Sequence, residues 1–240
     1  MTRRSIVIGG TRGIGKVIFD QLVKRGDCVY RVSRSDYSDS SNHIKFDITS
    51  PNIDLLVDQI DSNINYLVFS HRYRGIDWNV EFEVTVRAVN LIVEALISKF
   101  VTSESSIVII GSNASRFVVD EQSAQYHASR ASLESLTQYF AVKYGRKKVR
   151  FNCILPCTLI KPENQDFFIE GNQVRKMIEN ITPLGRMGSA EDIANLVEFL
   201  CSDKSSFITG QSFVVDGGLS LKGQESIARE LLCLQHKNTK

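Results

Sequence analysis

The chain has no apolar run long enough to cross a membrane, and its first ten residues, MTRRSIVIGG, enter a strand-like stretch rather than a signal peptide. The chain also has no large excess of charge of one sign, because 29 Lys and Arg against 27 Asp and Glu leave a net charge of +2. The basic run at 143–150, KYGRKKVR, is interpreted as a solvated helix end rather than a nucleic-acid patch. Neither nucleic acid nor a membrane is therefore expected as a partner.

Cysteine is scarce, with five residues and no C-x-x-C pair. An odd number without a signal peptide indicates reduced thiols and a cytoplasmic location. Cys153 and Cys157 lie four residues apart but lack a second pair of ligands, so no metal site is expected. No internal repeat or low-complexity segment is present, and 240 residues suffice for one α/β domain with a sizeable core.

Short apolar runs alternate with helical patterns along the chain. Strands are expected at 5–9, 28–32, 43–46, 65–69, 106–111, 149–155 and 212–215. Helices are expected near 14–25, 52–61, 78–100, 124–144, 172–180 and 189–202. This alternation predicts a doubly wound α/β fold of the Rossmann type, with helices on both faces of a mostly parallel sheet.

One domain is predicted over residues 1–220, followed by a tail at 221–240. The tail has the apolar spacing of a short amphipathic helix, which would pack on a neighbouring subunit. The apolar residues that give this spacing are Ile227, Leu231, Leu232 and Leu234.

The first strand ends in a glycine-rich turn, GGTRGIG, at residues 9–15. Glycine permits a tight turn, lets a pyrophosphate approach the backbone, and lets the next helix pack close to the strand. The helix N-terminus then offers free N–H groups to phosphates. The turn predicts a dinucleotide site, with a generic strand-to-helix turn as the alternative. The residues assigned to it are Gly9, Thr11, Arg12, Gly13, Ile14 and Gly15.

The end of the second strand bears on the choice of coenzyme. An acidic residue there would bond the ribose hydroxyls, whereas an arginine accommodates a 2′-phosphate. The strand ends in Ser33 and Arg34 without an acid, and Arg12 adds a second cation in the glycine turn. The pattern favours NADP(H), and the alternative is that both arginines are simply exposed to solvent.

The spacing Gly9-x-x-x-Gly13-x-Gly15 resembles the short-chain dehydrogenase/reductase family. A Tyr-x-x-x-Arg sequence at 126–130 resembles the family's Tyr-x-x-x-Lys signature. The segment 183–218 carries the most specific resemblance, to 3-oxoacyl-[acyl-carrier-protein] reductases and related keto-reductases that form tetramers. The resemblance implies hydride transfer between NADP(H) and a ketone or alcohol of a small molecule or carrier-bound acyl group, in a homotetramer or homodimer.

The same resemblance assigns catalytic roles. Tyr126 would be the general acid that protonates the carbonyl oxygen, and Ser112 would polarise that carbonyl. Arg130 lies one helical turn from Tyr126, on the same face, where a cation favours the phenolate. Asn90 would hold a water in a proton relay. Ser115 stays an alternative to Ser112, which lies one residue farther from Tyr126 than is usual.

Further coenzyme contacts are implied at the ends of other strands. Asp47 would meet the adenine, and on its own it could equally cap a helix after Pro51. The full set implied for these strand ends is Ser33, Arg34, Asp47, Ile48, Ser70 and Ile160.

Three departures from the family pattern favour a second hypothesis. The usual Asn-Asn-Ala-Gly after the fourth strand is replaced within SHRYRG at 70–75, and Cys157 stands where glycine is usual. Arg130 replaces lysine and cannot deprotonate in a proton relay. The alternative is a catalytically impaired, coenzyme-binding subunit that partners an intact homologue. A working enzyme should tolerate Arg130→Lys or benefit from it.

Two other features of the sequence invite chemistry. Arg72 and Arg74 would face the coenzyme phosphates, an acidic substrate or only solvent. Tyr139 and Lys143 also fit Tyr-x-x-x-Lys, but they lie later in the same helix, so a packing residue and a solvated helix end are expected there.

Overall fold

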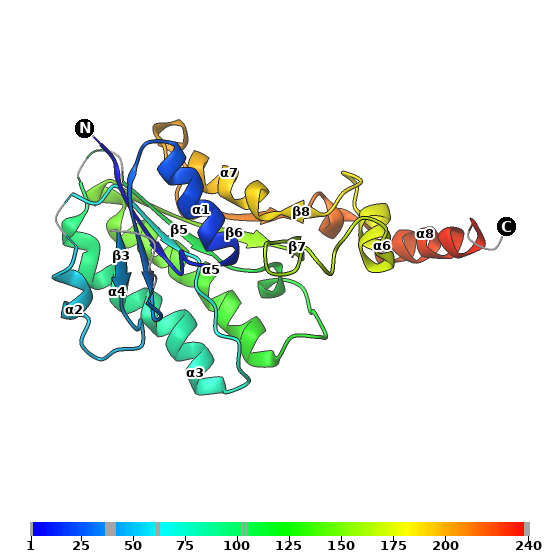
Figure 1. The fold of residues 1–240 in the computed structure, drawn as a ribbon, viewed down its shortest axis with the longest axis horizontal. Coiled ribbons are helices and arrows are strands. Elements are labelled where there is room, and N and C mark those ends of the chain that lie inside the picture. The colour runs from blue at the N-terminus through cyan, green and yellow to red at the C-terminus, as the bar shows by residue number, and fades with distance from the viewer. Residues whose placement is uncertain (1, 37–41, 61–62, 102, 104, 238–240) are drawn as a thin grey trace.

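A seven-stranded parallel sheet forms the centre of the computed structural model, which describes residues 2–36, 42–60, 63–101, 103 and 105–237 (Figure 1). Its strand order is β3-β2-β1-β4-β5-β6-β9. The strands are β1 (Arg4–Ile8), β2 (Cys28–Ser33), β3 (His43–Lys45), β4 (Tyr66–Phe69), β5 (Ser105–Ile110), β6 (Val149–Pro156) and β9 (Ser212–Val215). The predicted doubly wound fold is confirmed, and the order reverses between β1 and β4, where such folds bind ligands.

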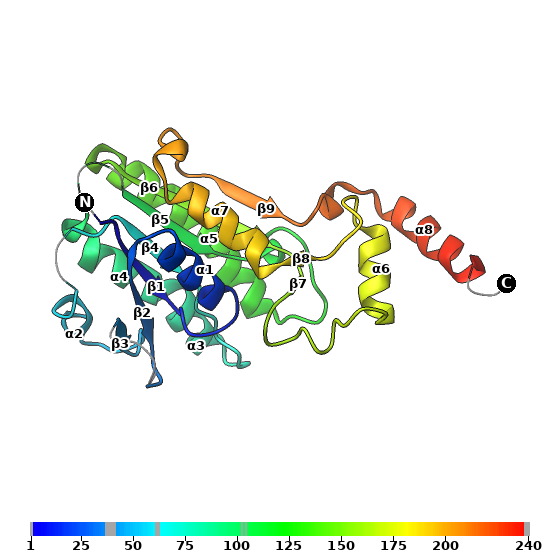
Figure 2. The ribbon, with the colours of Figure 1, turned by 45° about the horizontal axis from the view of Figure 1, so that its top comes forward.

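Helices cover both faces of the sheet (Figure 1, Figure 2). One face carries α1 (Gly13–Lys24) and α7 (Ala190–Leu200), and the other carries α4 (Ala88–Leu96) and α5 (Ala124–Tyr144). In β1, Ile6 and Ile8 join the core under α4 and α5, whereas Val7 joins the core under α1 and α7. This alternation explains why the strand is apolar throughout, because both of its faces are buried.

The helix predicted near 78–100 is not uniform. It begins as α3 (Trp78–Phe82), where the Asp77 side chain caps the Val80 N–H at 2.9 Å. It continues through a π-helical turn, η1 (Glu83–Arg87), into α4 and a 3₁₀ turn, η2 (Ile97–Lys99). The sequence prediction missed the π turn because apolar periodicity does not register a local change of hydrogen-bond spacing.

Other boundaries differ more simply. The helix predicted at 52–61 is reduced to α2 (Asp54–Val57), and residues 61–62 lie outside the described part of the chain. Two short strands, β7 (Leu159–Ile160) and β8 (Gly188–Ser189), form a second parallel pair that was not predicted. The remaining elements are α6 (Gln173–Ile181), α8 (Gln224–Lys237), η3 (Asn113–Ser115), η4 (Gly145–Lys147), η5 (Asp203–Ser205) and η6 (Leu219–Leu221).

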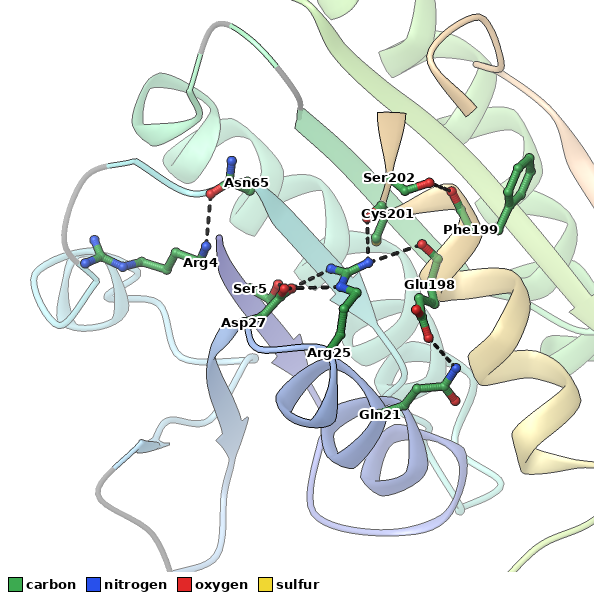
Figure 3. Close-up of polar contacts among 10 residues, drawn as sticks. All are labelled: Arg4, Ser5, Gln21, Arg25, Asp27, Asn65, Glu198, Phe199, Cys201 and Ser202. Carbon is green, nitrogen blue, oxygen red and sulfur yellow. Dashed lines mark hydrogen bonds and ion pairs between the residues drawn. The ribbon is translucent and has the colours of Figure 1, made fainter. Parts of the chain in front are cut away.

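A largely buried arginine fastens α1 to the end of α7 (Figure 3). Arg25 Nε and Nη2 donate to the two oxygens of Asp27 at 3.1 and 2.5 Å. Arg25 Nη1 donates to the carbonyls of Glu198 and Cys201, at 3.2 and 2.7 Å. Every nitrogen of this guanidinium therefore has a partner. The Ser5 hydroxyl also donates to Asp27, at 2.6 Å.

The C-terminal helix α8 projects away from the sheet beside α6, in both views (Figure 1, Figure 2). Lys222, just before α8, ties this helix to α6 by donating to the Ile181 carbonyl at 3.0 Å and to Glu230 of α8 at 2.6 Å. Leu232 is exposed, while the side chain of Leu234 lies outside the described residues. Over the described ranges, no helix combines the length and the hydropathy that a membrane span requires.

Candidate active site

The glycine turn between β1 and α1 has no room for a side chain at Gly9 or Gly15. A Cβ at Gly9 would lie 2.8 Å from the His71 backbone, and Gly9 has a φ of +83°. A Cβ at Gly15 would lie 2.2 Å from the Gly9 carbonyl oxygen. These contacts require glycine, as a turn that brings bare backbone to a phosphate does.

The start of α1 fits an anionic group. Gly13 and Ile14 begin the helix, and Thr11 and Arg12 precede it in the turn. Arg12 is the N-cap and makes no side-chain capping bond within the described ranges, and the first turn carries no acidic residue. The N–H groups of this turn are therefore available to a pyrophosphate.

An acidic side chain from another segment approaches that same place. A Cβ at Gly13 would lie 2.5 Å from Glu163 Oε1, so this carboxylate sits against the start of α1. Glu163 belongs to the turns at 161–172, between β7 and α6. Its Oε1 also lies 3.7 Å from Arg74 Nη2. The carboxylate therefore stands where an incoming phosphate would approach.

The edge between β1 and β4 places Ser70 beside the glycine turn. The Ser70 N–H donates to the Ile8 carbonyl at 2.9 Å, and a Cβ at Gly15 would lie 3.2 Å from Ser70 Oγ. Ser70 therefore lies with the glycines at the point where the strand order reverses. Ile160 lies in β7, where it pairs with Ser189 of β8.

The residues predicted to choose the coenzyme lie on the surface. Arg12 and Arg34 are both exposed. The Ser33 hydroxyl donates to the Ser35 carbonyl at 3.0 Å and lies 2.9 Å from His43 Nε2. Both arginines are therefore accessible to a phosphate.

Asp47 and Ile48 follow β3. Asp47 Oδ1 accepts from the Thr49 N–H at 3.0 Å and from the Thr49 hydroxyl at 2.8 Å, which closes a local turn. The alternative that Asp47 caps the next helix is wrong, because α2 begins at Asp54 with Ile53 as its N-cap. Ile48 packs partly against the core.

Two arginines contact the Tyr126 ring. The guanidinium carbon of Arg130, buried on the same helix, is 4.7 Å from the centre of the Tyr126 ring. The guanidinium carbon of Arg72, exposed after β4, is 5.2 Å from that ring centre. Arginine attracts the face of an aromatic ring and stabilises negative charge on its oxygen. The structure thus brings together the tyrosine and the cation that the sequence paired.

A buried glutamate completes this group, and the sequence analysis missed it. Glu81 of α3 accepts at Oε1 from the Thr85 and Ser129 hydroxyls, both at 2.7 Å. Arg130 Nη2 lies 3.7 Å from the same oxygen, and both side chains are 3% exposed. Glu81 lies far from Tyr126 in the sequence, so no spacing connects them. The one available signal in the sequence was that Glu81, an acidic residue, lies on the helix face whose other residues point into the core.

Ser112 and Ser115 can be told apart by their hydrogen bonds. Ser112 caps η3 by accepting from the Ala114 N–H at 3.2 Å, which leaves its hydroxyl proton available to a carbonyl. Ser115 instead donates its proton to the Ser112 carbonyl at 2.8 Å. The geometry favours Ser112 over Ser115. Asn90 lies half-buried in α4, just after the π turn.

His71 is held beside this group as a neutral ring. Its Nε2 donates to the carbonyl of Val84, inside the π turn, at 2.8 Å. Burial lowers the pKa of His71 from 6.5 to about 4. Its Nδ1 is buried and lacks a hydrogen-bond partner among the described residues. His71 thus fixes the π turn and is not charged near neutral pH.

The remaining candidates have ordinary roles. Burial raises the pKa of the Cys157 thiol to about 11, so it stays protonated and is not a nucleophile. Tyr139 is exposed, whereas a packing residue was expected, and Lys143 pairs with Glu94 of α4 at 2.8 Å. In the part of the chain that the structure describes, no group of His, Cys, Asp or Glu could hold a metal ion.

Comparison with known proteins decides the family. A family model described as enoyl-(acyl carrier protein) reductase matches residues 51–220. The chain belongs to the short-chain dehydrogenase/reductase family. A tropinone reductase homolog of Arabidopsis thaliana is 27% identical over 248 residues, with 92% of this chain and 93% of the relative covered. An L-rhamnose 1-dehydrogenase (NAD(P)(+)) of Sphingomonas sp. is 32% identical over 139 residues, with 58% of this chain and 54% of the relative covered.

Solved structures of short-chain dehydrogenases agree with this assignment. The ligand-free aldohexose dehydrogenase of Thermoplasma acidophilum has a TM-score of 0.81 at 25% identity, with 93% of this chain and 96% of that chain covered. A short-chain type dehydrogenase/reductase of Mycobacterium ulcerans has a TM-score of 0.80 at 25% identity, with 92% and 90% covered. The protein is thus an oxidoreductase of a family that uses NAD(P)(H).

Proposed function

We propose that this short-chain dehydrogenase/reductase uses NADP(H) to reduce a ketone to an alcohol, or catalyses the reverse reaction. The observation that carries the proposal is the contact of the Tyr126 ring with the buried Arg130 guanidinium, at 4.7 Å. A tyrosine beside a fixed cation can give and recover a proton more readily than one in water. The glycine turn, which has no room for a side chain at Gly9 or Gly15, supports coenzyme binding next to it.

In this proposal the Tyr126 hydroxyl donates its proton to the carbonyl oxygen, and the Ser112 hydroxyl donates a hydrogen bond to the same oxygen. The Arg130 charge stabilises the phenolate that remains. Asn90 supports the return of a proton through water. A bound nicotinamide coenzyme would supply the hydride. The residues proposed to hold it are Gly9, Thr11, Arg12, Gly13, Ile14, Gly15, Ser33, Arg34, Asp47, Ile48, Ser70 and Ile160.

The preference for NADP(H) rests on Arg12 in the glycine turn and Arg34 just after β2, which are both exposed. The substrate is proposed to be a small ketone or a carrier-bound acyl group, in keeping with the match to an acyl-carrier-protein reductase model. A homotetramer or homodimer in the cytoplasm is proposed from the family resemblance of segment 183–218.

Fluorescence titration with NADPH and NADH tests the coenzyme assignment. Wild-type protein should bind NADPH at least about tenfold more tightly than NADH, because the two arginines favour a 2′-phosphate. Arg34→Ala should remove most of that difference, whereas Arg146→Ala, at an exposed position of η4, should not. Equal affinity for both coenzymes contradicts the preference, and binding of neither contradicts the function.

One observation favours a second candidate function, a coenzyme-binding subunit with little turnover. Glu163 sits against Gly13, where a phosphate must approach, and Arg130 replaces the family's lysine. A protein that binds NADPH yet oxidises none in the presence of a panel of ketones would support this candidate over the enzyme.

A further inference from the structure

The buried group next to Arg130 contains a carboxylate, Glu81, that neither the family signature nor the proposed mechanism uses. Glu81 is 3% exposed, and its Oε1 accepts hydrogen bonds from Thr85 and Ser129, both at 2.7 Å. Two hydroxyls therefore fix the position of this oxygen. Thr85 comes from the π turn and Ser129 from α5, so the carboxylate joins the two helical elements that face each other here.

Arg130 depends on this carboxylate for its charge balance. Arg130 is 3% exposed, and Glu81 is its ion-pair partner, at 3.7 Å between Nη2 and Oε1. Arg130 Nε and Nη2 are buried without a hydrogen-bond partner among the residues that the structure describes. A buried guanidinium is costly unless a counter-ion compensates it. Glu81 compensates the charge of Arg130 at an ion-pair distance, without forming a hydrogen bond to Nε or Nη2.

We propose that Glu81 is a positioning residue for catalysis: it is the counter-ion that holds Arg130 beneath the Tyr126 ring and so lets arginine occupy the family's lysine position. This inference rests on the proposed function of Tyr126. Arginine is longer than lysine, and its charge is spread over a planar guanidinium. A fixed partner is therefore needed to set how far the guanidinium extends relative to the Tyr126 ring. Glu81 and Arg130 therefore act as one unit.

Several charged groups surround the phenol and bear on any pH dependence. Arg130 and Glu81 are buried, whereas Arg72, which also contacts the Tyr126 ring, is exposed. Lys161, after β7, interacts electrostatically with Tyr126, and His71 with Arg130. His127 is the aromatic neighbour, with its ring centre 6.3 Å away. Of these groups, Glu81 is the carboxylate that pairs with Arg130, so its removal leaves the positive charge of Arg130 uncompensated.

The test compares wild-type protein with E81Q, E81D, R130K and the double variant E81Q/R130K. The control is E83Q, the same substitution two residues along, on an exposed carboxylate that pairs with Arg87. For each protein, NADPH affinity, kcat, KM and the pH profile of kcat/KM are measured with one ketone. Thermal unfolding and circular dichroism establish that each variant is folded.

We expect E81Q to lower kcat by about tenfold while the NADPH dissociation constant changes by less than about threefold. Its pH profile should move to lower pH by about one unit, because the uncompensated Arg130 charge favours the Tyr126 phenolate. In the R130K background, the same substitution should cost less than about twofold in kcat. E83Q should match the wild type in every measurement.

The inference is overturned if E81Q behaves as E83Q does. It is also overturned if E81Q lowers kcat by the same factor in the wild-type and R130K backgrounds while the pH profile stays in place, because Glu81 would then support only the fold. If E81Q does not fold, E81D is the deciding variant. Aspartate keeps the negative charge but is one methylene shorter, so the charge lies farther from Arg130. We then expect kcat to fall with an unchanged pH profile, and a wild-type kcat contradicts the inference.

A failure of the proposed function can be recognised separately. If the wild type reduces no ketone, the alkaline ultraviolet titration of the Tyr126 phenolate, taken as a difference against Tyr126→Phe, still reports the charge pair. E81Q should then move that titration to lower pH without any turnover. An unmoved titration contradicts the role of Glu81, whatever the activity.

Discussion

Two arginine–carboxylate pairs inside the molecule differ in how completely their donors are used. Arg25 makes four hydrogen bonds, two to Asp27 and two to carbonyls at the end of α7, and its ion pair with Asp27 is 2.5 Å long. Arg130 is more deeply buried, yet it lies 3.7 Å from Glu81, and two of its nitrogens lack a partner in the described chain. The Arg25–Asp27 pair lies where α1 meets the end of α7, and the Arg130–Glu81 pair lies next to Tyr126.

The contrast separates a structural pair from a functional one. Arg25, whose three guanidinium nitrogens all donate hydrogen bonds, fixes the ends of two helices and uses four of its five N–H donors to do so (Figure 3). An arginine with spare, buried donors is a poor device for stability, because unmade hydrogen bonds in the interior cost free energy. A catalytic role is one explanation for such unpaired buried donors in a native structure. Two predictions test this contrast directly, and two more test charged groups elsewhere in the candidate site.

Removing the Arg130 pair should have the largest effect. In E81Q/R130M, turnover should fall by about 1,000-fold, or about 4 kcal/mol of transition-state stabilisation, because no cation remains on the buried side of Tyr126. The free energy of unfolding should stay within about 1 kcal/mol of the wild type, since a buried ion pair adds little stability. Steady-state kinetics and urea unfolding measure both. A large loss of stability with normal turnover would reverse the assignment.

Breaking the Arg25 pair should do the opposite. Arg25→Met leaves Asp27 buried without its counter-ion, so the free energy of unfolding should fall by about 3 kcal/mol. NADPH affinity and kcat, measured at a temperature where the variant is folded, should be unchanged. Gln21→Ala, which removes a more exposed contact to Glu198, is the matched control and should cost less than about 1 kcal/mol.

Acid should destabilise the region of the Arg130 pair through His71. Its pKa is lowered in the folded protein to about 4, so below its ordinary value of 6.5 the unfolded chain binds the additional proton. Stability should therefore decline as the pH falls from 6.5 to 4. His71→Gln keeps a donor for the Val84 carbonyl without the titration, so its melting temperature should fall less over that range. Equal slopes for both proteins would contradict this account of His71.

Glu163 should give the smallest effect, on coenzyme affinity. Glu163→Gln removes a negative charge that lies against Gly13, so NADPH should bind more tightly by about threefold to tenfold. Asp166→Gln, an exposed acid of the same segment, is the control and should leave the affinity unchanged. Isothermal titration calorimetry at low and high salt measures the difference. Weaker binding in Glu163→Gln would mean that this carboxylate helps to hold the coenzyme.

The fold was largely predictable because its signals are local. Apolar strands such as Ile107–Ile110 and the glycine turn each depend on neighbouring residues, and both were placed within a residue or two. The π turn at 83–87 was missed because it shifts hydrogen bonds without changing the apolar pattern. The pairing of β7 with β8 was missed because it joins segments far apart in the chain.

The candidate site was predictable only where its residues share one helix. Tyr126 and Arg130 are four residues apart, so helical geometry alone places them together. Glu81 and Glu163 reach the site from other elements, and only the packing of α3 on α5 and the course of 161–172 bring them there. The choice of Ser112 over Ser115 likewise depended on hydrogen bonds that residue counting does not provide.

Single-turnover oxidation of bound NADPH by a ketone, followed by stopped-flow absorbance, tests the central claim most directly. Wild-type protein should oxidise its bound coenzyme, and Tyr126→Phe should bind NADPH equally well but react about 1,000-fold more slowly, because the proton donor is gone. If Tyr126→Phe reacts at the wild-type rate, Tyr126 is not the acid. If the wild type binds NADPH and oxidises none with any ketone tested, the protein is a coenzyme-binding subunit and not the reductase proposed.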